Sequence, residues 1–488
     1  MQLVMAVVAA AVYALVALSV APPLDPAHCV ALAPLAPVHA AVCGGGGGAQ
    51  VAVTVGAAAG AAQRAAAGAV AAAVRAAVAG NGEAAARVAV YADGELVVDV
   101  RAVSGGAAAA TGDDAPDDDL FVVFSCTKVL ESLAVAILAD RGFLDYDAPI
   151  TDVWPGFAPG NGSATLAHLM RHELGLPALD RTLSLGWLSA SSDSERTALA
   201  ETLAVQMPMS APGERTFYHA ITRGLFVDEI VRRADPHGRS LAHFVQEEIA
   251  APLGLVGELA IGDGPGGLTP TLDARVVTHI PPHILTLAGT YLPQLFLPRG
   301  LARALYSDDT VLDGFEADFM ASIVLSPSST AARSITIADS AGERLKSAAD
   351  MANSPEFRAR GLTSAAGVTH ARALAKIGSV LAGGGAPLLS PAGLAAANAV
   401  RDDAPRFDEG FWRNISYSAA GWGMDRFALY GLPDWEGWAG AGGAVFIWNR
   451  KINTAFAYTP SLLLPRLKKV RGTRYLRAYL DALDAAAA

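Results

Sequence analysis

Residues 121–142 read FVVFSCTKVLESLAVAILADRG and join a serine, a lysine and an apolar helix in one segment. The apolar residues after the lysine recur with helical spacing, and Gly142 is a typical residue just beyond a helix end. Ser125 and Lys128 form the only Ser-x-x-Lys of the chain. A spacing of three residues places both side chains on one face of the helix start. Lys128 is the only charge between Leu120 and Leu130, which predicts that it is buried.

These two side chains have the chemistry of a nucleophile and its base. A serine hydroxyl is a poor nucleophile at neutral pH until a base removes its proton. A lysine in an apolar site can serve as that base. The start of a helix also directs backbone N–H groups towards a developing oxyanion. Taken alone, the motif is weak, because about two such tetrapeptides arise by chance in 500 residues. The alternative is a serine at a helix cap beside a surface lysine.

The longer segment resembles the serine β-lactamase-like superfamily, in the class C-related branch that includes carboxylesterases. Similar blocks follow in the order of that family at residues 121–157, 166–179, 212–233, 241–255, 370–385 and 437–449. The resemblance implies an α/β (α+β) fold of the β-lactamase/transpeptidase type, with an antiparallel sheet flanked by helices and a helical subdomain. The sheet would take the hairpin Arg87–Val100, whose Asp93-Gly94 is a hairpin signal, and the strands after Trp422.

The resemblance assigns two further parts of the site. The block Tyr218-His219-Ala220 stands where the family has Tyr-x-Asn. Tyr218 would therefore relay protons between Lys128, the leaving group and water. His219 lies within this block and is therefore a candidate for substrate binding. Ala220 lacks the amide that would bind an acyl-amide side chain, which resembles the esterase-like members.

The strand block Trp438-Ala439-Gly440 aligns with the Lys-Thr-Gly or His-x-Gly of the family. Gly440 would let the substrate approach closely, and the N–H of Ala441 would complete an oxyanion hole with that of Ser125. Trp438 replaces the cation that binds the carboxylate of β-lactams, because an indole has one donor and no charge. This substitution favours neutral esters and predicts that the indole forms an apolar wall for them.

Composition supports a folded protein with a separate N-terminal segment. The 488 residues are 52% hydrophobic and 17% charged, which excludes a wholly disordered chain. A net charge of −11 argues against a nucleic-acid partner. Residues 1–24 are uncharged and about 20 of them could span a bilayer. We interpret them as a signal peptide or a membrane anchor, which places the protein in the secretory pathway, secreted or anchored.

The remaining boundaries follow from the same patterns. Residues 25–60 are expected to form a low-complexity linker, and whether Cys29 and Cys43 within it pair is left open. Residues 61–488 are expected to form the hydrolase domain, with a variable insertion at 279–351. His168 and His172 have a spacing that can bind zinc, but no third ligand is apparent, so no metal and no cofactor are expected.

The leading hypothesis is a serine hydrolase that cleaves a small neutral ester or acyl substrate through an acyl-enzyme on Ser125. The alternatives are a β-lactamase or D-amino-acid peptidase, and a non-catalytic scaffold with the same fold. The chain has no Gly-x-Ser-x-Gly, which argues against the nucleophile turn of α/β-hydrolases. Oligomeric state is left undetermined.

Overall fold

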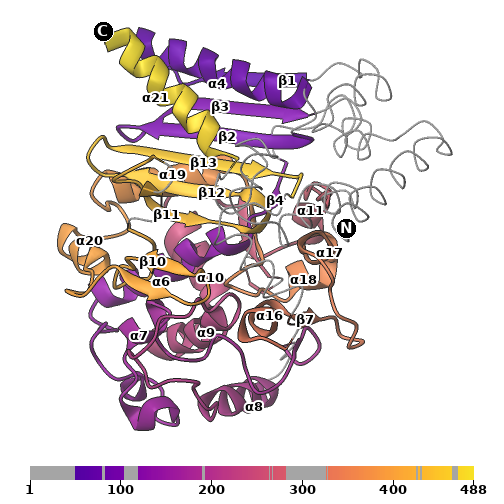
Figure 1. Ribbon diagram of the computed structural model, residues 1–488, viewed down its shortest axis with the longest axis vertical. Coiled ribbons are helices and arrows are strands. Elements are labelled where there is room, and N and C mark those ends of the chain that lie inside the picture. Colours follow the sequence, from indigo (N-terminus) through magenta and orange to yellow (C-terminus); the bar gives the residue numbers. More distant parts are fainter. Residues whose placement is uncertain are drawn as a thin grey trace, which may run out of the picture.

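Six antiparallel strands form the central sheet of the protein, in the spatial order β1-β3-β2-β13-β12-β11. The computed structural model describes residues 50–79, 83–103, 119–188, 193–262, 264–265, 267–281, 326, 328–424, 427–428, 431–463 and 471–487. The strands are β1 Gln50–Val55, β2 Ala85–Ala92, β3 Glu95–Val103, β11 Glu436–Ala439, β12 Val445–Asn449 and β13 Thr454–Pro460. The sheet therefore joins segments from the two ends of the described chain (Figure 1).

The predicted hairpin is present and slightly longer than Arg87–Val100. Asp93 and Gly94 form its turn with φ of +52° and +81°. Positive φ at both central residues is the turn geometry that matches the twist of paired strands, and an Asp-Gly pair adopts it readily. Together with the strands after Trp422, the hairpin confirms the predicted antiparallel sheet.

The two faces of the sheet are apolar and covered by different helices. Successive side chains of β12 alternate between the faces, as strand geometry requires: Val445 and Ile447 pack on one side, Phe446 and Trp448 on the other. The first face is covered by α4 Ala61–Ala79 and α21 Thr473–Ala487, which pack against each other (Figure 1). The second face is covered by α19 Ala371–Ala382.

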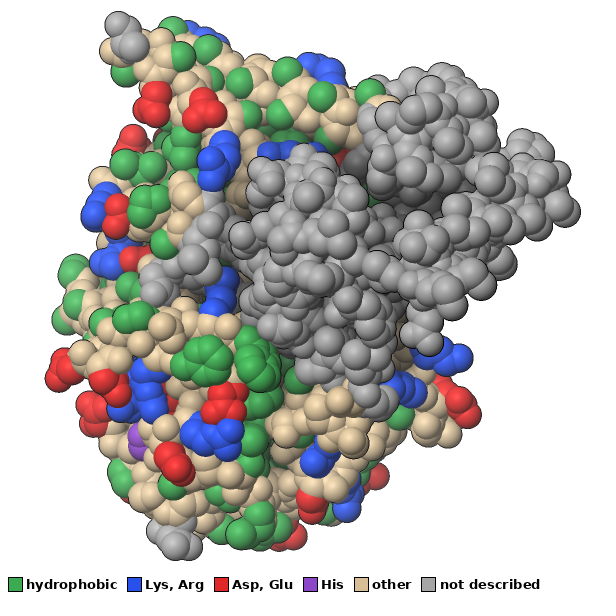
Figure 2. Space-filling view, viewed as in Figure 1, with side chains coloured by type: hydrophobic (Ala, Val, Ile, Leu, Met, Phe, Trp, Pro, Cys, Tyr) green, Lys and Arg blue, Asp and Glu red, His purple; other side chains and the backbone are tan. Residues whose placement is uncertain are grey.

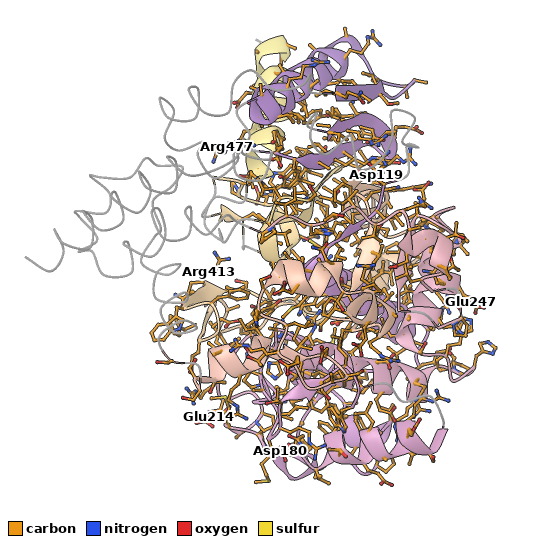
Figure 3. The ribbon with its side chains drawn as sticks, turned by 90° about the vertical axis from the view of Figure 1, so that its right-hand side faces the viewer. Asp119, Asp180, Glu214, Glu247, Arg413 and Arg477 are labelled. Atoms are coloured by element: carbon orange, nitrogen blue, oxygen red, sulfur yellow. The ribbon has the colours of Figure 1, made fainter. Side chains whose placement is uncertain are left out.

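A mainly helical region lies beyond α19. Its central element is α6 Thr127–Asp140, which packs against α9 Thr222–Ala234, α10 Leu241–Val245 and α20 Pro391–Asn398. The other described α-helices are α7 Leu166–Met170, α8 Asp193–Ala204, α11 Pro270–Asp273, α16 Thr330–Ile335, α17 Ala348–Asn353 and α18 Pro355–Ala359. Charged side chains such as Glu247 and Asp180 lie at the outside of this region (Figure 3).

Short strands connect the helical region to the sheet. Three of them, β4 Phe121–Val122, β8 Gly367–Thr369 and β6 Leu259–Ile261, form a small sheet. The first of these, β4, precedes the turn at Ser125 along the chain. The others form two-stranded pairs: β5 Leu183–Ser184 with β7 Ile337–Ala338, and β9 Arg406–Asp408 with β10 Arg413–Ile415. On the face seen in Figure 2, basic side chains lie among acidic ones and do not form a stripe.

The prediction that residues 25–60 form a linker is wrong for residues 50–55. Residues 50–55 form β1, which pairs along its whole length with β3. Val51 and Val53 pack against the core on that side, so this alternating run has a buried face despite its low-complexity surroundings. The predicted targeting segment, Cys29 and Cys43 lie outside the described residues, as does most of 282–327 within the predicted insertion. Among the helices that the structure describes, none is long and apolar enough to cross a bilayer.

The edge strand gives a direct test. Deleting residues 25–60 should lower the free energy of unfolding by about 2–3 kcal/mol, because β1 loses its pairing and two half-buried valines become absent. Deleting residues 25–49 should leave the melting temperature unchanged. Thermal unfolding of both truncated proteins beside the full chain measures the difference, expected to be a few degrees. Equal melting temperatures for the two truncations would show that β1 adds no stability.

Candidate active site

The nucleophile candidate lies in a sharp turn between a strand and a helix. Ser125 is the middle residue of a 3-10 helix, Phe124–Cys126, that runs directly into α6. Phe124 has a φ of +46°, which is uncommon for a residue with a side chain and marks a constrained turn. Thr127 stabilises the turn, since its hydroxyl donates to the carbonyl of Phe124 at 2.5 Å. Ser125 keeps partial exposure while its neighbours are buried.

Lys128 lies one turn further along, and its side chain is completely buried. Its Nζ donates to the carbonyl oxygens of Ala220 at 2.6 Å and Ser364 at 3.0 Å. A buried amine requires such partners, because an unpaired polar group in the interior is costly. A lysine ammonium has three N–H bonds and a neutral amine has two. The two carbonyls can therefore hold the side chain in either protonation state.

Tyr218 brings the third predicted side chain to the same place. Its hydroxyl donates to Ser125 Oγ at 2.7 Å, and Lys128 Nζ lies 5.0 Å from the centre of its ring. Tyr218 belongs to the loop before α9, and the other two residues belong to the start of α6. The structure thus brings together Ser125, Lys128 and Tyr218, which are up to 93 positions apart in the chain.

The end of β11 lies against the nucleophile turn. A Cβ on Gly440 would stand 2.3 Å from the carbonyl oxygen of Val123, so only glycine allows this approach. The N–H of Gly440 donates to Ala444 and that of Cys126 donates to Val123. Ala441 follows directly, is exposed, and begins a 3-10 turn, Ala441–Gly443. An oxyanion hole between the N–H groups of Ser125 and Ala441 stays a prediction.

The burial of Trp438 corrects the prediction that its indole forms an apolar wall for the substrate. The indole is 0% exposed and packs against the rings of Tyr218 at 5.8 Å, Tyr417 at 5.8 Å and His172 at 5.8 Å. Because it is fully buried and packs on Tyr218, it supports the tyrosine and does not itself present a surface to the substrate. Aromatic neighbours on several sides account for this position.

His219 is also not a substrate-binding residue. Its ring is fully buried, with Nδ1 bonded to the carbonyl of Phe217 at 2.7 Å and Nε2 accepting from the N–H of Leu176 at 3.0 Å. Burial lowers the pKa of His219 to about 3, so the imidazole is neutral. Both nitrogens therefore serve the fold of the loop beside Tyr218.

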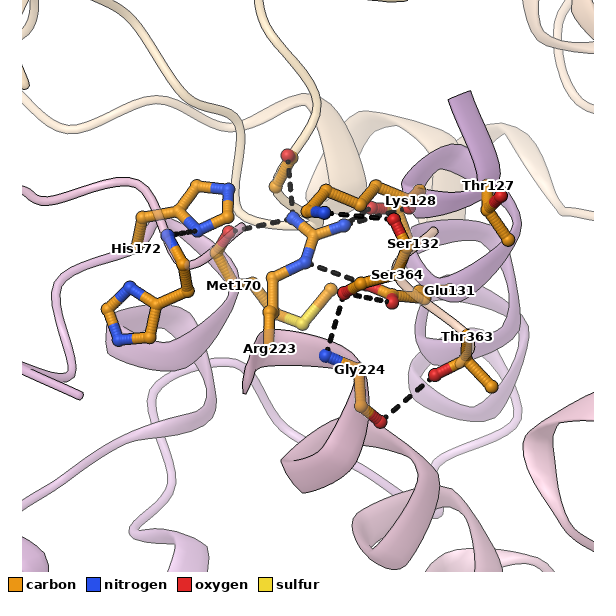
Figure 4. A network of polar contacts seen from close by, with 12 residues as sticks. Thr127, Lys128, Glu131, Ser132, Met170, His172, Arg223, Gly224, Thr363 and Ser364 are labelled. Carbon is orange, nitrogen blue, oxygen red and sulfur yellow. Dashed lines mark hydrogen bonds and ion pairs between the residues drawn. The ribbon is translucent and has the colours of Figure 1, made fainter. Parts of the chain in front are cut away.

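A buried charged network that the sequence did not predict lies next to Lys128 (Figure 4). Arg223 Nε donates to Glu131 Oε2 at 2.8 Å, with both side chains 0% exposed. Arg223 Nη2 donates to the carbonyl of Lys128 at 2.9 Å. Ser364 Oγ donates to Glu131 Oε1 at 2.6 Å. The network holds α6, α9 and the turn at Ser364 around the lysine. One signal was present, since Glu131 is an isolated charge one turn after Lys128 in an apolar helix.

The histidine pair has structural partners. His168 Nδ1 accepts from the N–H of Thr165 at the start of α7, and His172 Nδ1 accepts from the N–H of His219. Within the part of the chain that the structure describes, no three His, Cys, Asp or Glu side chains gather in a group that could hold a metal ion.

Comparisons with known proteins agree with this architecture. Residues 70–258 match the family model Beta-lactamase. The Esterase/beta-lactamase LipL of Mycobacterium tuberculosis (strain ATCC 25618 / H37Rv) is 32% identical over 168 residues, 34% of this chain and 35% of the relative. The chain thus matches about a third of the length of its curated relatives.

The fold is also that of solved structures. A family VIII carboxylesterase superposes with a TM-score of 0.66 at 23% identity, over 89% of this chain and 100% of that one. A penicillin-binding protein homologue from Caulobacter crescentus gives a TM-score of 0.61 at 25% identity, over 88% and 100%. The predicted fold class is confirmed. The chain therefore has the β-lactamase/transpeptidase-like fold, and its residues 70–258 are similar to the Beta-lactamase family.

The buried ion pair predicts a large loss of stability when it is broken. Glu131→Ala should lower the free energy of unfolding by about 3–5 kcal/mol, because Arg223 would keep its charge in a dry site. The exposed Glu247→Ala is the matched control, since surface pairs contribute about 0–1 kcal/mol. Urea unfolding of both variants compares them, and equal losses would show that Glu131 is not a structural centre.

Proposed function

We propose that this protein is a serine hydrolase that cleaves neutral esters through a covalent acyl-enzyme on Ser125. The observation that carries the proposal is the 2.7 Å hydrogen bond from the Tyr218 hydroxyl to Ser125 Oγ, beside the buried Lys128. A nucleophile within reach of a proton relay, next to an amine, is the arrangement that activates a serine. The similarity to an esterase/β-lactamase and to a carboxylesterase supports the same class.

The chemistry proceeds in two balanced halves. In acylation, Ser125 Oγ bonds to the ester carbonyl carbon while its proton passes to Lys128, directly or through Tyr218. The N–H groups of Ser125 and Ala441 stabilise the negative oxygen of the tetrahedral intermediate. The alkoxide then leaves and takes a proton through Tyr218, which leaves the acyl group on Ser125.

In deacylation, water takes the place of the alcohol. Tyr218 and Lys128 accept a proton as the water oxygen bonds to the acyl carbon, and the proton returns to Ser125 Oγ as the acid departs. Arg223 is held by Glu131, so that carboxylate has a permanently charged partner. Lys128 contacts neutral carbonyls. The amine can therefore lose its proton without leaving Glu131 unpaired.

The proposed preference for neutral substrates rests on the lack of a cation at position 438 and of an amide at position 220. The strand position that would carry a cation has an indole instead, and its packing on Tyr218 fills the space beside the tyrosine with apolar atoms. Ala220 is buried and offers its carbonyl to Lys128, not to a ligand. Neither residue supplies a charged partner for a substrate carboxylate.

The covalent step is tested with Ser125→Ala. The variant should fold normally, show no labelling by a fluorophosphonate probe and lose p-nitrophenyl ester turnover by more than about 10³-fold. Wild-type protein should carry one probe adduct, which mass spectrometry of the peptide containing Ser125 locates.

The exposed Ser340→Ala serves as the control, because this serine lies in a loop bonded to Glu356, in the region of α17 and α18. Turnover by Ser125→Ala at the wild-type level would exclude an acyl-enzyme on Ser125. An unlabelled and inactive wild-type protein would favour a non-catalytic scaffold.

The substrate class is tested by comparing a p-nitrophenyl ester, a penicillin and a D-alanyl peptide on the wild-type protein. Lack of one charge-assisted hydrogen bond costs about 1.5–3 kcal/mol, so kcat/KM for the penicillin should be lower by roughly tenfold to a hundredfold. A higher kcat/KM for the penicillin or the peptide would instead assign the protein to β-lactamases or D-amino-acid peptidases.

A further inference from the structure

Asp408 is a buried carboxylate next to the catalytic tyrosine, in the hairpin formed by β9 and β10. Its side chain is completely buried. Oδ1 accepts from the backbone N–H groups of Tyr218 at 3.0 Å, Gly410 at 2.8 Å and Phe411 at 3.1 Å. Oδ2 accepts from the Tyr417 hydroxyl at 2.7 Å. One side chain therefore ties the Tyr218 loop to the turn of a hairpin 190 residues away.

A buried carboxylate such as that of Asp408 needs hydrogen-bond donors in place of water. Burial raises the pKa of Asp408, and the hydrogen bonds from Tyr417 and the three N–H groups oppose that rise. A buried carboxylate is stable only when such donors replace water. All four of these donors must keep their places, so the geometry around the carboxylate is narrowly defined.

Close packing extends the restraint from the backbone to the ring. A Cβ on Gly410 would lie 2.7 Å from the Cβ of Tyr218, which shows how tightly the hairpin turn covers the tyrosine. The Phe411 ring lies 4.3 Å from the Tyr218 ring at an angle of 32°. Trp438 packs on Tyr218 at 5.8 Å and 31°. Phe411 and Trp438 thereby restrict the swing of the phenol.

The hairpin has other attachments that do not act on Tyr218. Arg215 pairs with Glu409 at the surface, and the N–H of Glu409 donates to the carbonyl of Thr216. In Figure 3, Glu214 and Arg413 mark the two segments on the same side of the molecule. These contacts can hold the hairpin in place, while Asp408 acts on the tyrosine itself.

We propose that Asp408 is a positioning residue for Tyr218, which it keeps at hydrogen-bond distance from Ser125. The inference rests on the proposed function, because the position of Tyr218 matters to the proton transfers of the acyl-enzyme cycle. Asp408 touches neither substrate nor the reacting atoms. It fixes the backbone of Tyr218 and places Phe411 against the ring, and proton transfer requires this fixed distance.

Three variants separate this role from general stability. Asp408→Ala removes the acceptor of three N–H groups, and a shift of the phenol by about 1 Å should lower kcat about a hundredfold. Asp408→Asn keeps an oxygen at Oδ1 and should retain kcat within about fivefold, since the three backbone bonds survive. Glu409→Gln, the next residue in the same turn, should behave as wild type, because it loses only the charge of a surface pair.

The measurements are the pre-steady-state burst of p-nitrophenol and the steady-state kcat and KM on the full chain. We expect kcat of Asp408→Ala to fall while KM stays within about threefold, because Tyr218 transfers protons and does not supply most of the binding. Gly410→Ala gives an independent test if Asp408→Ala does not fold. Its added methyl displaces Tyr218 and should lower kcat in the same way with the carboxylate intact.

A normal kcat in folded Asp408→Ala or in Gly410→Ala would overturn the positioning role, as would a change confined to KM. Asp408→Asn as inactive as Asp408→Ala would overturn it as well, because the charge and not the acceptor would then matter. Ser125→Ala is measured in the same assay. If Ser125→Ala is inactive, these outcomes refer to Asp408 alone, and if it is active, both the proposed function and the inference are wrong.

Discussion

Arg223 and Glu131 form an ion pair with no access to water, and the geometry of the whole site depends on it. Glu131 lies one helical turn after Lys128 on α6, and Arg223 lies at the start of α9. The guanidinium also bonds to the carbonyls of Met170, Lys128 and Gly421. It thereby joins four segments around one buried charge. Because a planar guanidinium offers five donors in fixed directions, it can hold several chain segments in one arrangement.

The charge of Glu131 is balanced by Arg223, while the contacts described above for Lys128 are with neutral carbonyls. Arg223 cannot lose its proton, so it compensates Glu131 at every stage of a reaction. Lys128 is held by two neutral carbonyls instead. A base must change its charge during catalysis, and a base paired with a buried carboxylate would resist that change. In the proposed mechanism, the ion pair therefore contributes to the chemistry as well as to the packing of α6 on α9.

The aromatic packing around Tyr218 completes the site from the other side. Trp438 comes from the edge strand of the sheet, Phe411 from the β9–β10 hairpin and His172 from the end of α7. Each ring buries apolar surface and fixes the direction of the phenol. The glycines at the contacts have a matching role, since Gly440 and Gly410 let two backbones approach at distances that a side chain would prevent. The sheet, the hairpin and the helical region thus meet at one tyrosine.

Local sequence patterns were sufficient for the hairpin at Asp93-Gly94, for the apolar helix after Lys128 and for the pairing of a serine with a lysine on one helix face, because spacing along the chain sets these features directly. They were not sufficient for β1, whose alternating valines occur among residues of low complexity. The family resemblance located Tyr218, but burial decided that Trp438 and His219 face inward. Arg223 and Asp408 have no local signature, since their partners lie about 90 to 190 positions away. Only the tertiary structure decides such contacts, because a buried charge takes its role from donors that distant segments bring to it.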